Sequence, residues 1–302
     1  MFIGFRGASK ANKSKKVKLL HSIYLFLRVI EESTYMYPSE KQLLTSPYLP
    51  TENMRFPSLR THSMCLGRDL DESTGMDFEF GLFGELDNPK RSGFFKDIYG
   101  LPQELISLIS RATFLANEIT MLRSRYPEFS TTSDLGNRCA ELETEICAWS
   151  DEGATGDAES DDPVAAFANR AIMAHLTEAF HCATIIFFYR RVRQLNPLLL
   201  QPWVEKTLAN LQEFEQEQRR FSLINCGIVW PGFIAGAEAL DLGLQARFHK
   251  HLRDCAKLSG MRNFELAANT LQDLWRARQG EGGENMTWMD LVRDRQLSLV
   301  LT

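Results

Sequence analysis

The most constraining feature of this sequence is a set of apolar residues that recur at three- and four-residue steps. The first stripe begins after Pro102, a residue suited to the first turn of a helix, and ends before Pro127. Its members are Leu105, Leu108, Ile109, Ala112, Leu115, Ile119 and Leu122. This spacing places all the side chains on one face of an α-helix, so that face must pack against another element.

Similar stripes continue along the chain, separated by prolines, glycines and polar residues. The segment from Pro163 to about Gln194 is apolar nearly all round, which indicates a helix buried among others. Asn263 is predicted to cap a later helix, and Thr287 and Asp290 have the spacing of a capping box. Alternating, strand-like runs are nearly absent. The sequence therefore predicts an all-α fold, an antiparallel array of about eight to ten helices with an irregular N-terminal extension.

Residues 1–92 have a different character from residues 93–302. They hold turn-forming residues and prolines and show little sustained periodicity. We expect a basic, irregular and partly disordered linker with one short helix near residues 17–32, followed by a helical regulatory domain over 93–302. The start of the linker is basic and includes Lys13, Lys15, Lys16 and Lys18. These lysines could bind a nuclear-import receptor or contact nucleic-acid phosphates, and a solvated tail explains them equally well.

Charge and cysteine spacing exclude several classes of protein. A formal net charge of -5 argues against a surface built mainly to bind nucleic acid. The six cysteines form no Cys-x-x-Cys pair, so zinc ribbons and thioredoxin-type sites lack support. The best apolar run, near Leu19–Ile30, is well short of the roughly 20 residues of a membrane helix, and we expect no membrane association.

Histidines give no predicted metal site. His175, Glu178 and His181 follow at three-residue steps, which turns the outer pair about 240° apart around a helix. His249 and His251 point to nearly opposite sides of theirs. Neither set has the i, i+4 geometry of a zinc-binding His-Glu-x-x-His, so satisfied structural histidines are the preferred interpretation.

Catalytic motifs are also absent from the sequence. Asp161 and Asp162 are similar to the aspartate-rich motif of helical isoprenoid synthases, but they directly precede Pro163, where a helix cap explains them more simply. Hydrolase, dinucleotide and P-loop signatures are missing. We therefore expect a protein that is not an enzyme, with two alternatives left open: an isoprenoid-synthase-like enzyme and a helical scaffold that binds no ligand.

Charged residues also occur in the most apolar segments. Glu238 follows a nearly uncharged run and needs a partner, which we predict to be Arg247 or Arg253. Three arginines end the helix that starts at Pro163, where positive charge complements the helix dipole: Arg190, Arg191 and Arg193.

The segment Cys226–Ala239, with the sequence CGIVWPGFIAGAEA, resembles the tryptophan-proline helix of fungal-specific transcription factor domains. Three further features agree in order: Gly100-Leu101-Pro102, then Gly260-Met261-Arg262-Asn263 leading to Leu271 and Trp275, and finally Trp288. The resemblance covers about residues 93–295. It is nearest to the branch of binuclear zinc-cluster proteins that contains sterol-uptake and arginine-metabolism regulators.

The resemblance implies a nuclear protein that controls metabolic or secondary-metabolite genes. Such domains act through dimerisation, co-regulator contact or small-molecule sensing, so we expect a homodimer or a heterodimer with a related transcription factor. An apolar effector is also expected, because the sterol-type branch is thought to hold one. The predicted effector pocket is lined by Phe187, Phe188, Trp230 and Phe233.

This sequence departs from the family's pattern at its N-terminus. The family carries a cysteine-rich DNA-binding zinc cluster ahead of the linker, and here only Cys65 precedes residue 93. We therefore expect no cofactor in this chain, and direct DNA contact lacks support without the zinc cluster. Two explanations stay open. The sequence is a truncated gene product or fragment, or the protein acts without binding DNA, for example by pairing with a full-length relative.

Overall fold

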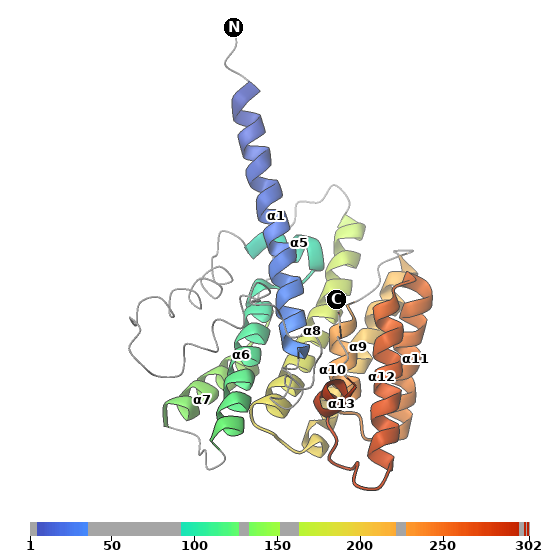
Figure 1. Ribbon diagram of the computed structural model, residues 1–302. Helices are drawn as coiled ribbons and strands as arrows, with labels where there is room; N and C mark the ends of the chain where they lie inside the picture. Colours follow the sequence, from blue (N-terminus) through green and yellow to red (C-terminus); the bar gives the residue numbers. More distant parts are fainter. Residues whose placement is uncertain are drawn as a thin grey trace, which may run out of the picture.

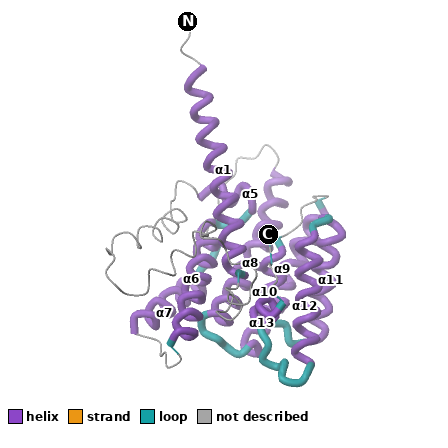
Figure 2. The backbone as a smooth tube through the Cα atoms, viewed as in Figure 1, coloured by secondary structure: helices purple, strands orange, loops and turns teal. Residues whose placement is uncertain are grey.

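The computed structural model describes residues 5–35, 92–126, 133–151, 163–221 and 228–295, together with residues 299 and 301. Within these residues the chain is helical and has no strand (Figures 1 and 2). The prediction of an all-α fold is confirmed. The elements are α1 (Phe5–Thr34), α5 (Ser92–Tyr99), α6 (Gln103–Arg125), α7 (Ser133–Ala148), α8 (Pro163–Arg191), the 3-10 helix η3 (Pro197–Leu200), α9 (Gln201–Arg220), α10 (Val229–Ala237), α11 (Leu242–Ser259), α12 (Arg262–Gln279) and α13 (Trp288–Asp294).

Helix α8 lies at the centre of the array. It contacts α6 and α7 on one side and α9 and α10 on the other, and Figure 1 shows it between these groups. Its buried residues run continuously from Ala179 to Phe188. A helix that packs against neighbours on several sides needs apolar residues around its circumference, which is the pattern seen in the sequence.

Helix α10 is buried along its whole length. It contacts α8, α9, α11 and α12, so the C-terminal helices pack around it. Gly236 permits this packing, because a Cβ atom there would lie 2.7 Å from Leu271 Cδ1 and 3.3 Å from the Phe248 ring. Its carbonyl accepts a hydrogen bond of 3.1 Å from Trp275 Nε1.

Helix α1 is longer than the short helix predicted near residues 17–32. Its C-terminal part packs against α5 and α6 through buried side chains such as Phe26 and Ile30. Ser33 Oγ accepts a hydrogen bond of 2.8 Å from Trp230 Nε1 in α10. This end of α1 therefore belongs to the helical body. Residues 36–91, most of the predicted linker, lie outside the described residues, so the division at residue 92 stays a prediction.

Helix termini match the predicted caps in part. Thr287 and Asp290 form the predicted capping box at the start of α13. Asn263 does not cap α12, because the helix begins at Arg262 and its N-cap residue is Met261. That prediction was wrong by two residues, an error typical of helix boundaries inferred from sequence.

Among the described residues, two helices have the length and composition of a membrane span. The windows are Gln103–Arg123 in α6 and Asn169–Arg191 in α8, and 61% and 67% of them, respectively, are buried inside the protein. Packing against the other helices therefore accounts for much of their apolar surface.

Candidate functional site

The four aromatic residues predicted to line an effector pocket are all buried. The Trp230 ring lies 5.5 Å from Phe180 and 5.9 Å from Phe187, measured between ring centroids. Phe233 meets Trp288 edge-on at 5.8 Å. Phe188 directly follows Phe187, and consecutive helical residues point about 100° apart. Phe188 therefore points in a different direction from Phe187 and lies edge-on against Tyr189. The structure thus joins Phe187 to Trp230, while the existence of a pocket stays a prediction.

A buried positive charge lies beside this aromatic cluster. The guanidinium of Arg191, near the end of α8, lies 5.9 Å from the centroid of the Phe187 ring. Its Nη2 donates to Asn117 Oδ1 at 2.8 Å and its Nη1 contacts Met289 Sδ, while its buried Nε has no hydrogen-bond partner among the described residues. Burial lowers the pKa of Arg191 to about 10, and the positive charge of Arg293 adds to this effect. Within the part of the chain that the structure describes, Arg191 therefore carries a buried charge with only neutral partners.

The neighbouring Arg190 is in the opposite situation. Its Nε lies 2.8 Å from Oε2 of Glu238, and Nη2 of Arg278 lies 3.9 Å from the same oxygen. The contact with Arg190 lacks the alignment of a hydrogen bond, so the attraction is mainly Coulombic. Burial raises the pKa of Glu238, and the two guanidiniums oppose that effect. The Glu238 cluster, defined by these three residues, is a buried ionic group in which each guanidinium faces the one shared carboxylate, so every charge has an opposite charge within 4 Å.

The predicted partners of Glu238 were wrong. Arg247 donates to Gln212 Oε1 at 2.6 Å, and Arg253 donates to Glu265 Oε1 at 2.9 Å. Glu238 follows the last residue of α10, where the ends of α8 and α12 meet it, so its partners come from those helices. Distance in the sequence gave no indication of this contact.

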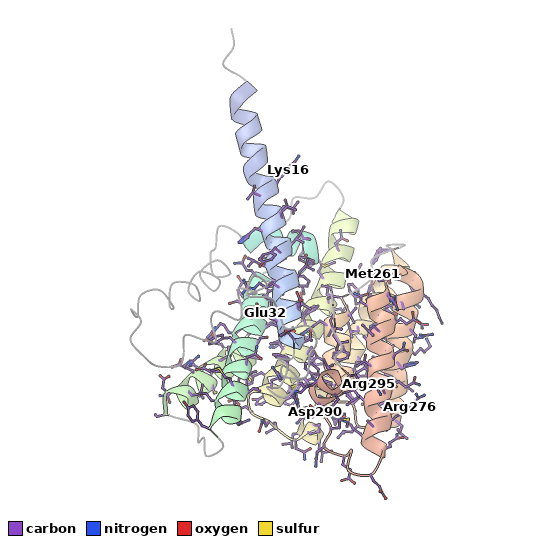
Figure 3. The ribbon with its side chains drawn as sticks, viewed as in Figure 1. Lys16, Glu32, Met261, Arg276, Asp290 and Arg295 are labelled. Carbon is purple, nitrogen blue, oxygen red and sulfur yellow. The ribbon has the colours of Figure 1, made fainter. Side chains whose placement is uncertain are left out.

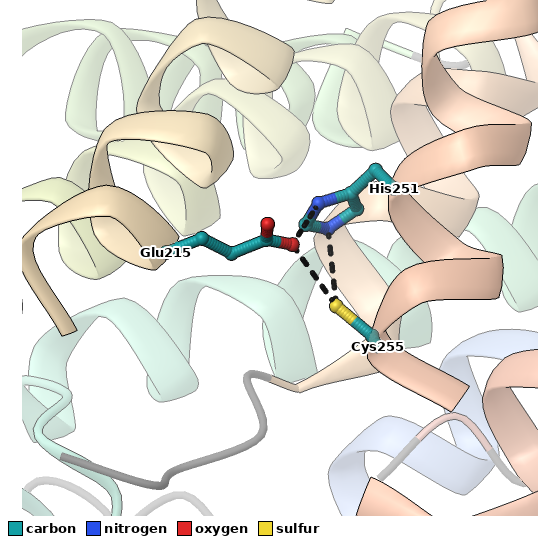
Figure 4. Close-up of side chains that lie close together, drawn as sticks. All are labelled: Glu215, His251 and Cys255. Carbon is teal, nitrogen blue, oxygen red and sulfur yellow. Dashed lines mark hydrogen bonds and ion pairs between the residues drawn. The ribbon is translucent and has the colours of Figure 1, made fainter. Parts of the chain in front are cut away.

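A third group joins α9 to α11 (Figure 4). Glu215 in α9 faces His251 and Cys255, which lie one turn apart on α11. Glu215 Oε1 lies 2.6 Å from His251 Nδ1 and accepts from Cys255 Sγ at 3.1 Å, while Cys255 Sγ and His251 Nε2 are 3.9 Å apart. Burial acts to raise the pKa of Glu215, but His251, Cys255 and Arg219 outweigh it and the pKa is lowered.

Sequence reasoning missed this group because it compared histidines with histidines and cysteines with cysteines. The available signal was the i, i+4 spacing of His251 and Cys255, which places both on one helix face. Glu215 comes from a separate helix and had no detectable link to them.

The other candidate histidines diverge, as the helical geometry predicts. His175 Nδ1 lies 3.1 Å from Asn210 Oδ1, whereas His181 Nε2 contacts the Ile146 carbonyl at 2.8 Å. Asp161 and Asp162 lie outside the described residues.

The basic stretch lies on α1, whose N-terminal part extends beyond the other helices (Figure 1). Lys16 is exposed and is labelled in Figure 3. The side chains of Lys13, Lys15 and Lys18 lie outside the described residues.

The described residues form an all-α body with buried aromatic and charged groups at its helix junctions. The chain belongs to the fungal specific transcription factor domain family, whose model matches residues 2–302. This is a family of regulatory domains of fungal zinc-cluster transcription factors and not of enzymes. The family resemblance seen in the sequence is confirmed.

One curated relative is Arginine metabolism regulation protein II of Saccharomyces cerevisiae. The chain is 24% identical to it over 208 residues, which cover 68% of this chain and 23% of the yeast protein. The match therefore spans about a quarter of that relative's length. No solved structure matches the chain significantly. Membership of a transcription factor family implies a role in the nucleus.

Proposed function

We propose that this domain regulates transcription of metabolic genes in response to a small molecule with an apolar body and an acidic group. The name of the yeast relative, Arginine metabolism regulation protein II, supports metabolic targets. The observation that carries the proposal is the buried guanidinium of Arg191 against the Phe187 ring, with no carboxylate among the described residues to balance it.

The physical argument rests on the cost of an unpaired buried charge. Removing a charge from water is unfavourable unless an opposite charge compensates for it. A carboxylate bound to Arg191 would supply that charge and engage the unpartnered Nε, since guanidinium and carboxylate groups pair through parallel hydrogen bonds. Phe187 and the adjacent Trp230, two of the four residues predicted to line the pocket, would contact the apolar body.

Access to Arg191 would involve α13. This seven-residue helix carries Met289, which contacts Arg191, and Arg293. The helix is anchored by the buried Trp288, Leu291 and Val292, and Trp288 packs against Phe233 of α10. Because Met289 covers the guanidinium of Arg191, we expect that side chain, and not the whole helix, to move when the effector binds.

The test is a thermal-shift screen of the purified chain with amphipathic carboxylic acids and their isosteric primary amides. A ligand present at 100 times its Kd stabilises the folded state by about 2.7 kcal/mol, which raises Tm by roughly 5–10 °C for a domain of this size. We expect acids to raise Tm and the matched amides to have little effect. A rise with amides or neutral sterols but not with acids would contradict the acidic effector.

Dimerisation is the second part of the proposal. Zinc-cluster transcription factors commonly dimerise. Four apolar side chains on α1 follow steps of three, four and three residues and are 41% to 65% exposed: Val17, Leu20, Tyr24 and Leu27. This is the spacing of a coiled-coil seam. We propose that it pairs with α1 of a second copy or of a related transcription factor.

Sedimentation analysis tests the seam. Leu20→Glu is expected to shift the protein from dimer to monomer, whereas Leu258→Glu, at a similarly exposed site on α11, should leave the dimer intact. A dimer that survives Leu20→Glu would refute this seam.

The basic stretch is proposed to direct nuclear import, and replacing Lys13, Lys15, Lys16 and Lys18 together by Gln should move a fluorescent fusion to the cytoplasm.

A further inference from the structure

We propose that Glu215, His251 and Cys255 form a site for one zinc-class divalent cation that links α9 to α11. The three residues offer a carboxylate oxygen, an imidazole nitrogen and a thiol sulfur, and these atoms all lie within 4.8 Å of one another. Figure 4 shows the three side chains converging from the two helices. Thiolate, imidazole and carboxylate are the donors that zinc takes in proteins.

The spacing of the donors suits a tetrahedral ion. Zinc bonds of about 2.0–2.3 Å place tetrahedral donors roughly 3.3–3.7 Å apart. The observed distances lie on either side of this range, with 3.9 Å between His251 Nε2 and Cys255 Sγ and 3.1 Å between Glu215 Oε1 and Cys255 Sγ. Each of these two separations differs from the tetrahedral range by about 0.2 Å. Rotation of the Glu215 side chain would adjust the distance to Cys255, and rotation of the two side chains on α11 would adjust the distance between His251 and Cys255.

One polar atom of this cluster has no hydrogen bond among the described residues. The His251 side chain is 7% exposed, and its Nδ1 lies 2.6 Å from Glu215 Oε1 without the alignment of a hydrogen bond. A buried ring nitrogen without a hydrogen bond is unfavourable. Coordination through His251 Nε2 would fix the ring proton on Nδ1, and a reoriented Glu215 carboxylate would bind the ion through one oxygen and accept from Nδ1–H through the other.

Charge balance favours a divalent ion in this buried position. The Glu215 carboxylate supplies one negative charge, and metal binding releases the thiol proton of Cys255 to solvent, which supplies a second. Two anionic donors and one neutral imidazole then neutralise the charge of the cation. The sulfur donor selects zinc-class ions over magnesium or calcium, which prefer oxygen. With three donors from the described residues, one coordination position stays open for water or another ligand.

The experiment uses the full chain after treatment with a chelator and a thiol reductant. Titration with Zn²⁺ should show one ion bound per chain, and Co²⁺ should give a thiolate-to-metal absorption band in the near ultraviolet. Mg²⁺ should compete with neither. Cys255→Ser and Glu215→Gln should each weaken Zn²⁺ binding at least about tenfold, and Cys255→Ser should abolish the cobalt band. Cys182→Ser, which removes a buried cysteine of α8, is the matched control and should retain both signals.

A second measurement remains decisive if a variant fails to fold. In the wild-type chain, Zn²⁺ should slow alkylation of Cys255 more than that of Cys182, as read by mass spectrometry of the labelled peptides. Absence of stoichiometric zinc binding, a cobalt band that survives in Cys255→Ser, or equal alkylation of Cys255 with and without Zn²⁺ would each overturn the site. None of these readings depends on an effector, so the site can fail while the proposed function holds.

Discussion

Arg190 and Arg191 are neighbours in sequence but lie in opposite environments. Arg190 faces the end of α10 and pairs with Glu238, whereas Arg191 points toward α6 and α13, where it meets Asn117 and Met289. Consecutive helical residues point about 100° apart, so adjacent side chains reach different neighbours. A buried charge is therefore structural when an opposite charge on another helix pairs with it. It is a candidate ligand-binding group when no opposite charge does.

The largest loss of folding stability is expected when the Glu238 cluster, which pairs opposite charges, is disrupted. Glu238→Ala leaves the guanidiniums of Arg190 and Arg278 without their shared carboxylate, and breaking a buried pair by removing one partner costs about 3–5 kcal/mol. Equilibrium urea denaturation measures the loss. The exposed pair of Arg253 and Glu265 is the control, since Glu265→Ala should cost at most about 1 kcal/mol. Similar losses in the two variants would remove the distinction between buried and exposed pairs.

A double-mutant cycle measures how strongly Glu238 is coupled to each of its two arginine partners. Arg190 lies 2.8 Å from Glu238 and Arg278 lies 3.9 Å away, so the first pair should be coupled more strongly. We expect a coupling energy of about 2–3 kcal/mol for Glu238 with Arg190 and less than about 1 kcal/mol with Arg278. Arg278 also donates to the carbonyls of Ala237 and Met286, so its single mutant should still be destabilised. Stronger coupling of Glu238 to Arg278 than to Arg190 would contradict the assignment of Arg190 as its main partner.

The smallest effect on stability is expected when Arg191, which has no carboxylate partner among the described residues, is replaced. Arg191→Met replaces a buried, unpaired charge by an apolar side chain of similar length, at the loss of the hydrogen bond to Asn117. Replacing a buried charge in this way is often neutral or stabilising. We expect the free energy of unfolding without ligand to stay within about 1 kcal/mol of the wild type or to rise. A loss above about 2 kcal/mol would place Arg191 among the structural charges.

The sequence predicted well those features that depend on local spacing. The buried character of α8 and the capping box of Thr287 and Asp290 follow from residues close together along the chain, and both were predicted. Trp230, which the family resemblance singled out in the sequence, is fully buried.

Contacts between distant segments were beyond the same reasoning. The partners of Glu238 come from α8 and α12, and the wrong choice of Arg247 or Arg253 came from preferring residues closer in sequence. The three arginines at the end of α8 were predicted only to complement the helix dipole, and nothing local distinguished Arg190 from Arg191. Glu215 likewise meets His251 only because α9 packs on α11.

The most direct test of the central claim is calorimetric titration of an acid identified in the thermal-shift screen into the wild-type chain and into Arg191→Met. Bidentate pairing of a carboxylate with a buried guanidinium predicts measurable binding to the wild type and at least about a tenfold loss of affinity in Arg191→Met. Arg276→Met, an exposed arginine of α12, should bind as the wild type does. Equal affinity in the wild type and Arg191→Met would contradict the assignment of Arg191 as the group that recognises the effector.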